Sequence, residues 1–350
     1  MVNYKYIIAV LMSIGILRLK SSKDATAQSV AKIRHCESIL EDPSERLYED
    51  PYAEQMYFGS SVQTWWGGNL TRKISDWIFA GMFDLLSLRT KWIDDAILAH
   101  VVDDSNTNSG GGVASAEQLV ILGAGYDTRG FRLDLPDGFL VVEVDQPGVQ
   151  SKKRKRLEGI AATDNSVASK LRATNSNDSQ LSSRVEFLEI DFNKDSVGEI
   201  LLSSATSLEH TKKTIVTLEG VTQYIPKTST ASTLQQVHSV LPEGSILLIS
   251  YVPQAVYDNP SECGINDPKK LSYMLKTVEW FGEPWISSWS PESFASFLNE
   301  CGYEVVSDVS APELNEKYLL PRNRGREKHE LPSLERYVVA SMVKKYKDDE

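Results

Sequence analysis

The chain has 350 residues, of which 41% are hydrophobic and 24% are charged, so it can form an ordinary globular core in one large or two small domains. A formal net charge of −11 at pH 7 argues against general affinity for nucleic acid or anionic lipid. Cys36, Cys263 and Cys301 are too far apart for a disulfide framework or a zinc-ligand spacing, and the histidines are scattered, so we expect no structural metal.

An apolar run, residues 6–17 (YIIAVLMSIGIL), follows Lys5 near the N-terminus. It is short for a membrane span but fits the core of a signal peptide, and Ala25-Thr26-Ala27 is a small-x-small cleavage pattern. The charged residues between them disfavour cleavage, so a leader helix that packs on the domain is the alternative. We treat residues 1–28 as a leader and expect a cytoplasmic protein, with secretion or membrane association only through residues 6–17.

Residues 29–103 show a helical pattern that is interrupted at Pro43, Pro51 and the Gly67-Gly68 pair. Apolar side chains recur there in steps of three and four, which predicts helices with one buried face. Residues 104–117 (DSNTNSGGGVASAE) have no periodicity and three consecutive glycines. That composition predicts a flexible linker before the next domain.

The stretch 118–133 (QLVILGAGYDTRGFRL) begins with a branched apolar run that is typical of a strand buried on both faces. Gly123 and Gly125 then allow a sharp turn at which a ligand can approach the backbone. Asp145 ends the next apolar run, and its spacing from Gly125 is the one that brings a carboxylate to a ribose diol. The sequence therefore predicts a nucleoside cofactor.

The identity of that nucleoside follows from the residues after the turn. Position 128 is Thr, whereas a dinucleotide fingerprint needs a third glycine there. The carboxylate of Asp127 would repel a pyrophosphate but not the sulfonium and ammonium groups of S-adenosyl-L-methionine. We favour S-adenosyl-L-methionine, with a nicotinamide or flavin cofactor as the alternative.

Seven apolar runs recur at the rhythm of alternating strands and helices, at 119–122, 140–144, 185–190, 214–218, 246–252, 303–309 and 337–342. Two insertions interrupt this rhythm. Residues 161–183 are rich in Ser, Asn, Ala and Thr, which predicts a solvated loop, whereas 253–289 carries aromatic residues that could form the walls of an acceptor pocket. The basic run 152–156 (KKRKR) could be a nuclear localisation signal, but we interpret it as a solvated helix face.

Acidic residues close several strands at the edge where open α/β sheets bind ligands. Asp145 would accept both ribose hydroxyls, and Asp191 would accept from the adenine amino group, with the backbone of Phe192 beside the ring. Glu219 would face the methionine end of the cofactor and oppose its positive charge. A carboxylate at a strand end can instead cap the following helix, and this reading stays open for Asp191.

The chain resembles the leucine carboxyl methyltransferase family, and within it the bacterial-type S-adenosyl-L-methionine-dependent methyltransferases. The matching segments are RTKWIDD (89–95), VILGAGYDTR (120–129), EVDQP (143–147), LEGVTQYIP (218–226) and ERYVVA (335–340). The resemblance implies the α/β fold of class I methyltransferases, a Rossmann-like seven-stranded sheet whose last strand enters antiparallel beside the sixth. It also implies a helical cap at 29–103, a methyltransferase core at 118–345, and a contact between Arg89 and the cofactor carboxylate.

The expected activity is S-adenosyl-L-methionine-dependent methylation, on the oxygen of a carboxylate or hydroxyl of a small molecule or a protein C-terminus. A carboxylate acceptor needs no general base, so we assign no catalytic residue and name only Tyr224 and Tyr251 as candidates that line the transfer cavity. One alternative is a methyltransferase specific for protein C-terminal leucine. The others are a non-catalytic relative that binds the cofactor or a partner, and a nicotinamide oxidoreductase, which Thr128 disfavours.

Overall fold

A computed structural model describes residues 24–57, 67–79, 81–101, 116–172, 184–192, 194–280, 282–325 and 331–343. The apolar run at 6–17 and most of the predicted linker lie outside the described residues. Within the described ranges, no helix is both long enough and apolar enough to cross a membrane.

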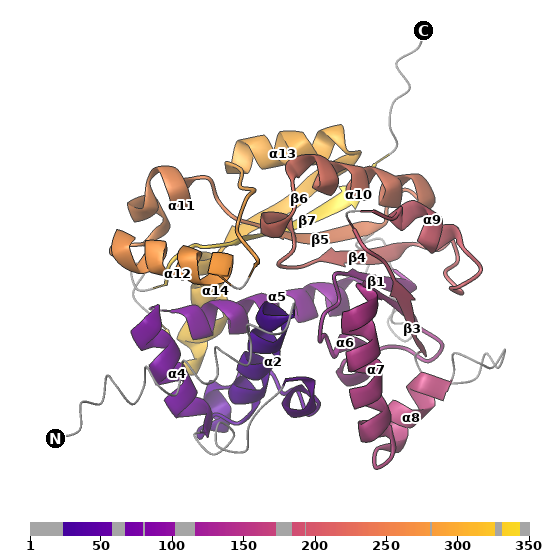
Figure 1. Ribbon diagram of the computed structural model, residues 1–350, viewed down its shortest axis with the longest axis horizontal. Helices are drawn as coiled ribbons and strands as arrows, with labels where there is room; N and C mark the ends of the chain where they lie inside the picture. Colours follow the sequence, from indigo (N-terminus) through magenta and orange to yellow (C-terminus); the bar gives the residue numbers. More distant parts are fainter. Residues whose placement is uncertain are drawn as a thin grey trace, which may run out of the picture.

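Seven strands form one sheet in the order β3-β2-β1-β4-β5-β7-β6 (Figure 1). The strands are β1 (Gln118–Leu122), β2 (Leu140–Asp145), β3 (Arg184–Glu189), β4 (Thr214–Leu218), β5 (Ile246–Tyr251), β6 (Tyr303–Ser310) and β7 (Arg336–Met342). Strands β1 to β5 are parallel, and β7 runs antiparallel to both β5 and β6. The predicted fold class and the antiparallel entry of the last strand are confirmed.

Helices cover both faces of the sheet. They are α2 (Ala25–Ser38), α4 (Gly67–Ile78), α5 (Met82–His100), α6 (Arg129–Arg132), α7 (Pro147–Ala161), α8 (Asn165–Arg172), α9 (Val197–Leu202), α10 (Lys227–Val240), α11 (Ala255–Asp258), α12 (Pro268–Trp280), α13 (Pro291–Glu300) and α14 (Ala311–Leu314). Short 3-10 or π turns are η1 (Pro43–Glu45), η2 (Ala53–Met56), η4 (Thr222–Tyr224), η5 (Pro260–Cys263), η6 (Asn315–Leu319) and η7 (Leu320–Arg322). Figure 1 shows α9, α10 and α13 on one side of the sheet and α5, α7 and α8 on the other.

Alternation along each strand divides the core between these two faces. In β1, Ile121 packs in the cluster that contains Trp92 of α5, whereas Val120 packs in the cluster that contains Leu234 of α10. All five residues of β1 are buried, which explains why the run reads as continuously apolar. The carboxyl ends of β1, β2 and β4 lie level, because Leu122 pairs with Val144 on one side and with Leu218 on the other.

The N-terminal helices cap one side of the domain and are held by a segment from the other end of the chain. Arg324, which follows η7, donates to Glu37 of α2 at 2.6 and 2.8 Å and to Asp84 of α5 at 2.7 Å. All three side chains are fully buried. The connection between β6 and β7, residues 311–335, is thus a third insertion that the sequence analysis did not identify.

Two sequence interpretations are wrong in part. Helix α8 lies inside the segment predicted as a solvated loop, and its Val167 is fully buried in the core. The basic run is not wholly solvated, because Lys153 is fully buried and pairs with Glu143 of β2. Arg154 and Lys155 of the same run are exposed, as predicted.

Candidate functional site

The turn after β1 is closed by two glycines in the left-handed backbone region. Gly123 has φ +70° and Gly125 has φ +49°, values that residues with a Cβ rarely adopt. A Cβ on Gly123 would lie 2.6 Å from Cγ2 of Val221, so the segment after β4 approaches this turn closely. The Gly125 N–H donates to Oδ2 of Asp145 at 2.5 Å. A hydrogen bond therefore joins the turn to the end of β2, as the sequence spacing between Gly125 and Asp145 predicted.

Asp145 already accepts backbone hydrogen bonds through both carboxylate oxygens. Its Oδ1 accepts from the N–H of Gln146 at 2.6 Å, and its Oδ2 from Gly125. Burial raises the pKa of Asp145, and these two backbone donors act in the opposite direction. Each carboxylate oxygen has capacity for one further donor, which is what a ribose diol requires.

Asp191 closes a turn just after β3. Its Oδ2 pairs with the exposed Lys194 at 2.6 Å, and its N–H donates to Oδ2 of Asp195 at 2.8 Å. The neighbouring Phe192 is partly buried against the core on the α10 side. The following helix α9 is capped by Ser196, whose hydroxyl accepts from the N–H of Glu199, so helix capping by Asp191 is not observed. The predicted adenine contacts of Asp191 and Phe192 stay predictions.

Glu219 follows β4 and is held by two arginines. Arg89 of α5 donates from Nε to Oε1 of Glu219 at 2.8 Å, and Arg129 of α6 donates from Nη1 to Oε2 at 2.7 Å. Although burial acts to raise the pKa of Glu219, the two guanidinium groups outweigh burial and the pKa is lowered. Glu219 is therefore an ionised carboxylate and a weak base at neutral pH.

Arg89 is engaged on its other side by Glu335, which precedes β7. The Nη1 of Arg89 donates to Oε2 of Glu335 at 2.8 Å and to Oε1 at 3.1 Å. Burial acts to lower the pKa of Arg89, but the charges of Glu335 and Glu219 raise it above its ordinary value. The contact with the cofactor carboxylate that the family resemblance implies stays a prediction, because these described bonds all go to protein carboxylates.

The network continues from Arg129 towards the cap. Arg129 Nε donates to Oδ1 of Asp94 at 2.7 Å, and Nη1 donates to Oδ2 of Asp127 at 2.5 Å. Arg132 makes two further bonds to Asp94, at 2.7 and 2.8 Å. Asp127 is therefore paired with Arg129, a charge that it shares with Asp94 and Glu219, so its expected repulsion of a pyrophosphate is weaker than the sequence alone indicated.

Counted as one connected cluster, the network carries a net negative charge. Arg132 approaches Asp50 at 3.6 Å, and Asp50 also pairs with Arg34 at 2.9 Å. The described members are four arginines (34, 89, 129 and 132) and five acids (50, 94, 127, 219 and 335). The cluster as a whole thus has one more acid than arginine, and Glu219 at the end of β4 is held by two of the arginines.

The two candidate tyrosines lie in different environments. Tyr224 ends η4, and burial raises its pKa to about 12, with the nearby Trp285 acting in the opposite direction. Tyr251 stacks on Phe294 of α13 at a centroid distance of 4.0 Å and donates to Oδ2 of Asp308 at 2.8 Å. Tyr224 therefore interacts with Trp285 of the 253–289 insertion, whereas the hydroxyl of Tyr251 is engaged by Asp308.

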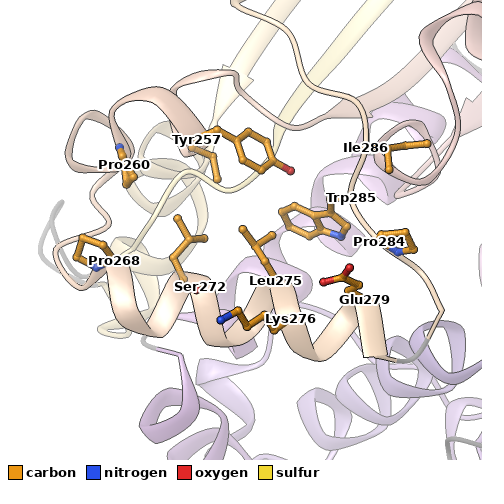
Figure 2. Close-up of a pocket in the computed structure, with 12 residues that line it drawn as sticks. Tyr257, Pro260, Pro268, Ser272, Leu275, Lys276, Glu279, Pro284, Trp285 and Ile286 are labelled. Atoms are coloured by element: carbon orange, nitrogen blue, oxygen red, sulfur yellow. The ribbon is translucent and has the colours of Figure 1, made fainter.

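A cavity of about 630 Å³ lies within that insertion (Figure 2). Its walls come from α11, α12 and residues 284–286, and they include the rings of Tyr257 and Trp285 and the aliphatic side chain of Leu275. The backbone N–H of Ile286 donates to the carbonyl of Gln223 at 2.7 Å, which attaches the cavity wall to the segment after β4. The insertion thus forms a pocket beside the edge that carries Glu219.

Gly123, Gly125, Asp145, Arg89 and Glu219 were predicted from the sequence as cofactor-binding residues, but the ion pairs that join Arg89 and Glu219 to the other arginines and acids were not predicted. The network members Asp94, Asp127, Arg129 and Glu335 all occur in the segments that carry the family resemblance. The available signal was the presence of paired acids and arginines within those segments, for example D-T-R at 127–129. No group of histidine, cysteine and acidic side chains in the described ranges has the arrangement of a metal site.

Residues 26–238 match the family model described as leucine carboxyl methyltransferase. A Bacillus subtilis protein named as a candidate S-adenosyl-L-methionine-dependent methyltransferase is 25% identical over 211 residues, which cover 60% of this chain and 61% of that protein. A Mycobacterium sp. (strain KMS) protein of the same description is 25% identical over 328 residues. The match covers 86% of this chain and 96% of that protein.

A crystal structure of a DUF574 family protein from Streptomyces avermitilis shares the fold. Its TM-score is 0.52 at 14% sequence identity, and the alignment covers 88% of this chain and 98% of that protein. Agreement over almost the whole of that protein supports the arrangement of sheet and cap described above.

Proposed function

Because the chain belongs to the leucine carboxyl methyltransferase family, whose cofactor is S-adenosyl-L-methionine, we propose that it methylates an oxygen atom of an acceptor bound in the insertion cavity. The acceptor oxygen belongs to a carboxylate or a hydroxyl group. The observation that carries the proposal is the position of the cavity, whose wall is attached to the same post-β4 segment that begins at Glu219.

The described residues fit this cofactor. The positive φ values at Gly123 and Gly125 leave backbone without side chains where a ligand must approach, and Asp145 can accept from two hydroxyls. A bound S-adenosyl-L-methionine has one net positive charge, from its sulfonium, ammonium and carboxylate groups. The cluster that includes Glu219 has five acids and four arginines, so its overall charge does not oppose a cation.

The cofactor supplies an electrophilic methyl group, which the acceptor oxygen takes as the bond from carbon to sulfur breaks and sulfur keeps the electron pair. The chain therefore has to align the acceptor and exclude water rather than provide covalent chemistry. Glu219 is a poor base because two arginines hold it ionised. This favours an acceptor that is already ionised, such as a carboxylate.

The cofactor assignment is tested by calorimetric titration of S-adenosylhomocysteine into the full chain. We expect a dissociation constant on the order of micromolar and, for Asp145→Ala, a loss of about 2 kcal/mol, or roughly thirtyfold, as expected for lost hydrogen bonds to a charged group. Glu304→Ala, an exposed position on β6, is the matched control. Absence of binding by the wild-type chain would overturn the assignment.

The acceptor oxygen is tested with methyl-labelled cofactor and an extract of small molecules. Methyl esters release labelled methanol on mild base treatment, whereas methyl ethers keep their label. Base-released methanol is expected for a carboxylate acceptor, whereas base-stable label that mass spectrometry of the product places on an oxygen would show a hydroxyl acceptor. Label on nitrogen or carbon alone would contradict oxygen methylation.

A further inference from the structure

The start of α2 lies against the turn that carries the predicted cofactor contacts. A Cβ on Gly125 would lie 3.2 Å from the Cβ of Ala27, so the first turn of α2 packs on this glycine. The N–H of Gly125 also donates to Asp145, the predicted ribose ligand. A cofactor bound between this turn and Asp145 would therefore lie next to residues 24–28.

Asp24 fixes the start of α2 to the turn and to α7. Its Oδ2 accepts from the hydroxyl of Tyr126 at 2.5 Å and from Nζ of Lys152 at 3.0 Å. Asp24 stands at the N-cap position, where an aspartate commonly accepts from the first N–H groups of its helix, yet its side chain caps none of the described N–H groups of α2. The carboxylate thus anchors α2 to other elements instead of capping it.

A hydrogen bond joins the same segment to the insertion. The hydroxyl of Thr26 donates to Oε2 of Glu283. Glu283 is held at the end of α12, because its N–H donates to the carbonyl of Val278 at 3.1 Å. Pro284, the next residue, lines the cavity (Figure 2). Residues 24–28 therefore connect the cofactor turn with the wall of the cavity.

These two attachments differ in how readily they open. Asp24 is 3% exposed, and Arg34 further along α2 donates to the carbonyl of Tyr126 at 2.5 Å. Thr26 and Glu283 are both partly exposed, so water can replace the hydrogen bond between them. The attachment to the insertion therefore opens at a lower cost than the attachment to the turn.

We propose that residues 24–28 form a gate over the cofactor turn, with Asp24 as its anchor and the hydrogen bond between Thr26 and Glu283 as its latch. S-adenosyl-L-methionine enters, and S-adenosylhomocysteine leaves, while the latch is open. The closed gate excludes water from the methyl group during transfer. This gate requires the cofactor of the family but no particular acceptor, so it goes beyond the function proposed above.

The test measures the rates of S-adenosylhomocysteine binding and release by surface plasmon resonance, with the full chain immobilised. Thr26→Val keeps the shape of the side chain but removes the donor of the latch, and Glu283→Ala removes its acceptor. Each substitution should raise both rates at least about fivefold, as expected for a lost hydrogen bond to a charged group, and leave Kd within about threefold of the wild-type value. A gate changes both rates together, whereas a residue that contacts the cofactor changes mainly the release rate.

Thr277→Val is the matched control, because the hydroxyl of Thr277 donates to the carbonyl of Tyr273 within α12, and its rates should equal those of the wild type. The double variant Thr26→Cys, Glu283→Cys can also be cross-linked with a short bismaleimide, since the native cysteines are buried. The cross-link should slow both rates at least about tenfold relative to the unlinked double variant.

Unchanged rates in Thr26→Val, in Glu283→Ala and in the cross-linked protein would overturn the gate, as would a rise in the release rate alone. A wild-type chain that does not bind S-adenosylhomocysteine would overturn the gate together with the cofactor assignment. Rates that change as expected, combined with methyl label on nitrogen or carbon alone, would support the gate and contradict only the proposed function.

Discussion

Arg129 and Glu219 form a buried ion pair in which Nη1 lies 2.7 Å from Oε2, although the two residues are 90 positions apart. The same guanidinium group contacts Asp94 and Asp127, so one side chain joins α5, the turn before α6 and the end of β4. Burial acts to lower the pKa of Arg129, but its three acidic neighbours raise it well above its ordinary value. Arg129 therefore stays charged and links α5, the turn before α6 and the end of β4.

Replacement of Arg129 with Met should destabilise the fold by about 3 to 5 kcal/mol, because it leaves buried carboxylates without their partner. Urea denaturation at neutral pH measures this loss. Lys212→Ala removes a partly exposed pair with Glu209 and should cost less than about 1 kcal/mol. Equal effects of the two substitutions would contradict the structural role of Arg129.

The effect of Arg129→Met should also depend on pH. Arginine neighbours lower the pKa of Asp127 and of Glu219, so their pairing stabilises the native state fully above the ordinary carboxylate pKa, about 4. As pH falls through the lowered native values, this stabilisation is lost. The difference in stability between wild type and variant should therefore shrink below about pH 4.

Gly123→Ala should weaken both stability and S-adenosylhomocysteine binding. Its φ of +70° strains a residue with a Cβ, and the new methyl group would meet Val221, so we expect a loss of about 1 to 3 kcal/mol. Gly159→Ala in α7 is the control, because a Cβ there meets nothing within 4 Å. That variant should be neutral or more stable by up to about 1 kcal/mol and bind normally. Normal binding by Gly123→Ala would argue against ligand approach at this turn.

The buried pair of Glu143 and Lys153 predicts a pH dependence of a different sign. Burial raises the pKa of Glu143 to about 7, with Lys153 acting in the opposite direction. Between about pH 4.5, the ordinary glutamate value, and pH 7 the native state binds more protons than the unfolded state, so its stability falls as pH rises. The double variant Glu143→Gln, Lys153→Met removes both charges and should lack this slope.

Denaturation of both proteins at several values between pH 5 and pH 8 measures the difference. The wild type should lose up to about 3 kcal/mol relative to the double variant as pH rises towards 7, with little change above it. Parallel pH profiles for the two proteins would show that Glu143 is already ionised at pH 5. Glu143 lies on the same strand as Asp145, so the same series reports on the packing at the end of β2.

Local patterns in the sequence determined the sheet and part of the site. Short apolar runs predicted the seven strands, because a strand covered on both faces must be apolar at every position. Gly125 and Asp145 were predicted to lie close together because they belong to one strand, turn, helix and strand unit, within which spacing along the chain fixes separation in space, and their hydrogen bond confirms this. Glu219 was found as the residue that ends a predicted strand.

Only the tertiary structure decided which charges meet. Arg89 pairs with Glu219 across 130 positions and with Glu335 across 246, and no periodicity encodes such partners. The same holds for Lys153, which looks like part of a solvated basic run until the packing of α7 brings it against Glu143. Local patterns reflect the backbone geometry of a single element, whereas these ion pairs depend on how separate elements pack.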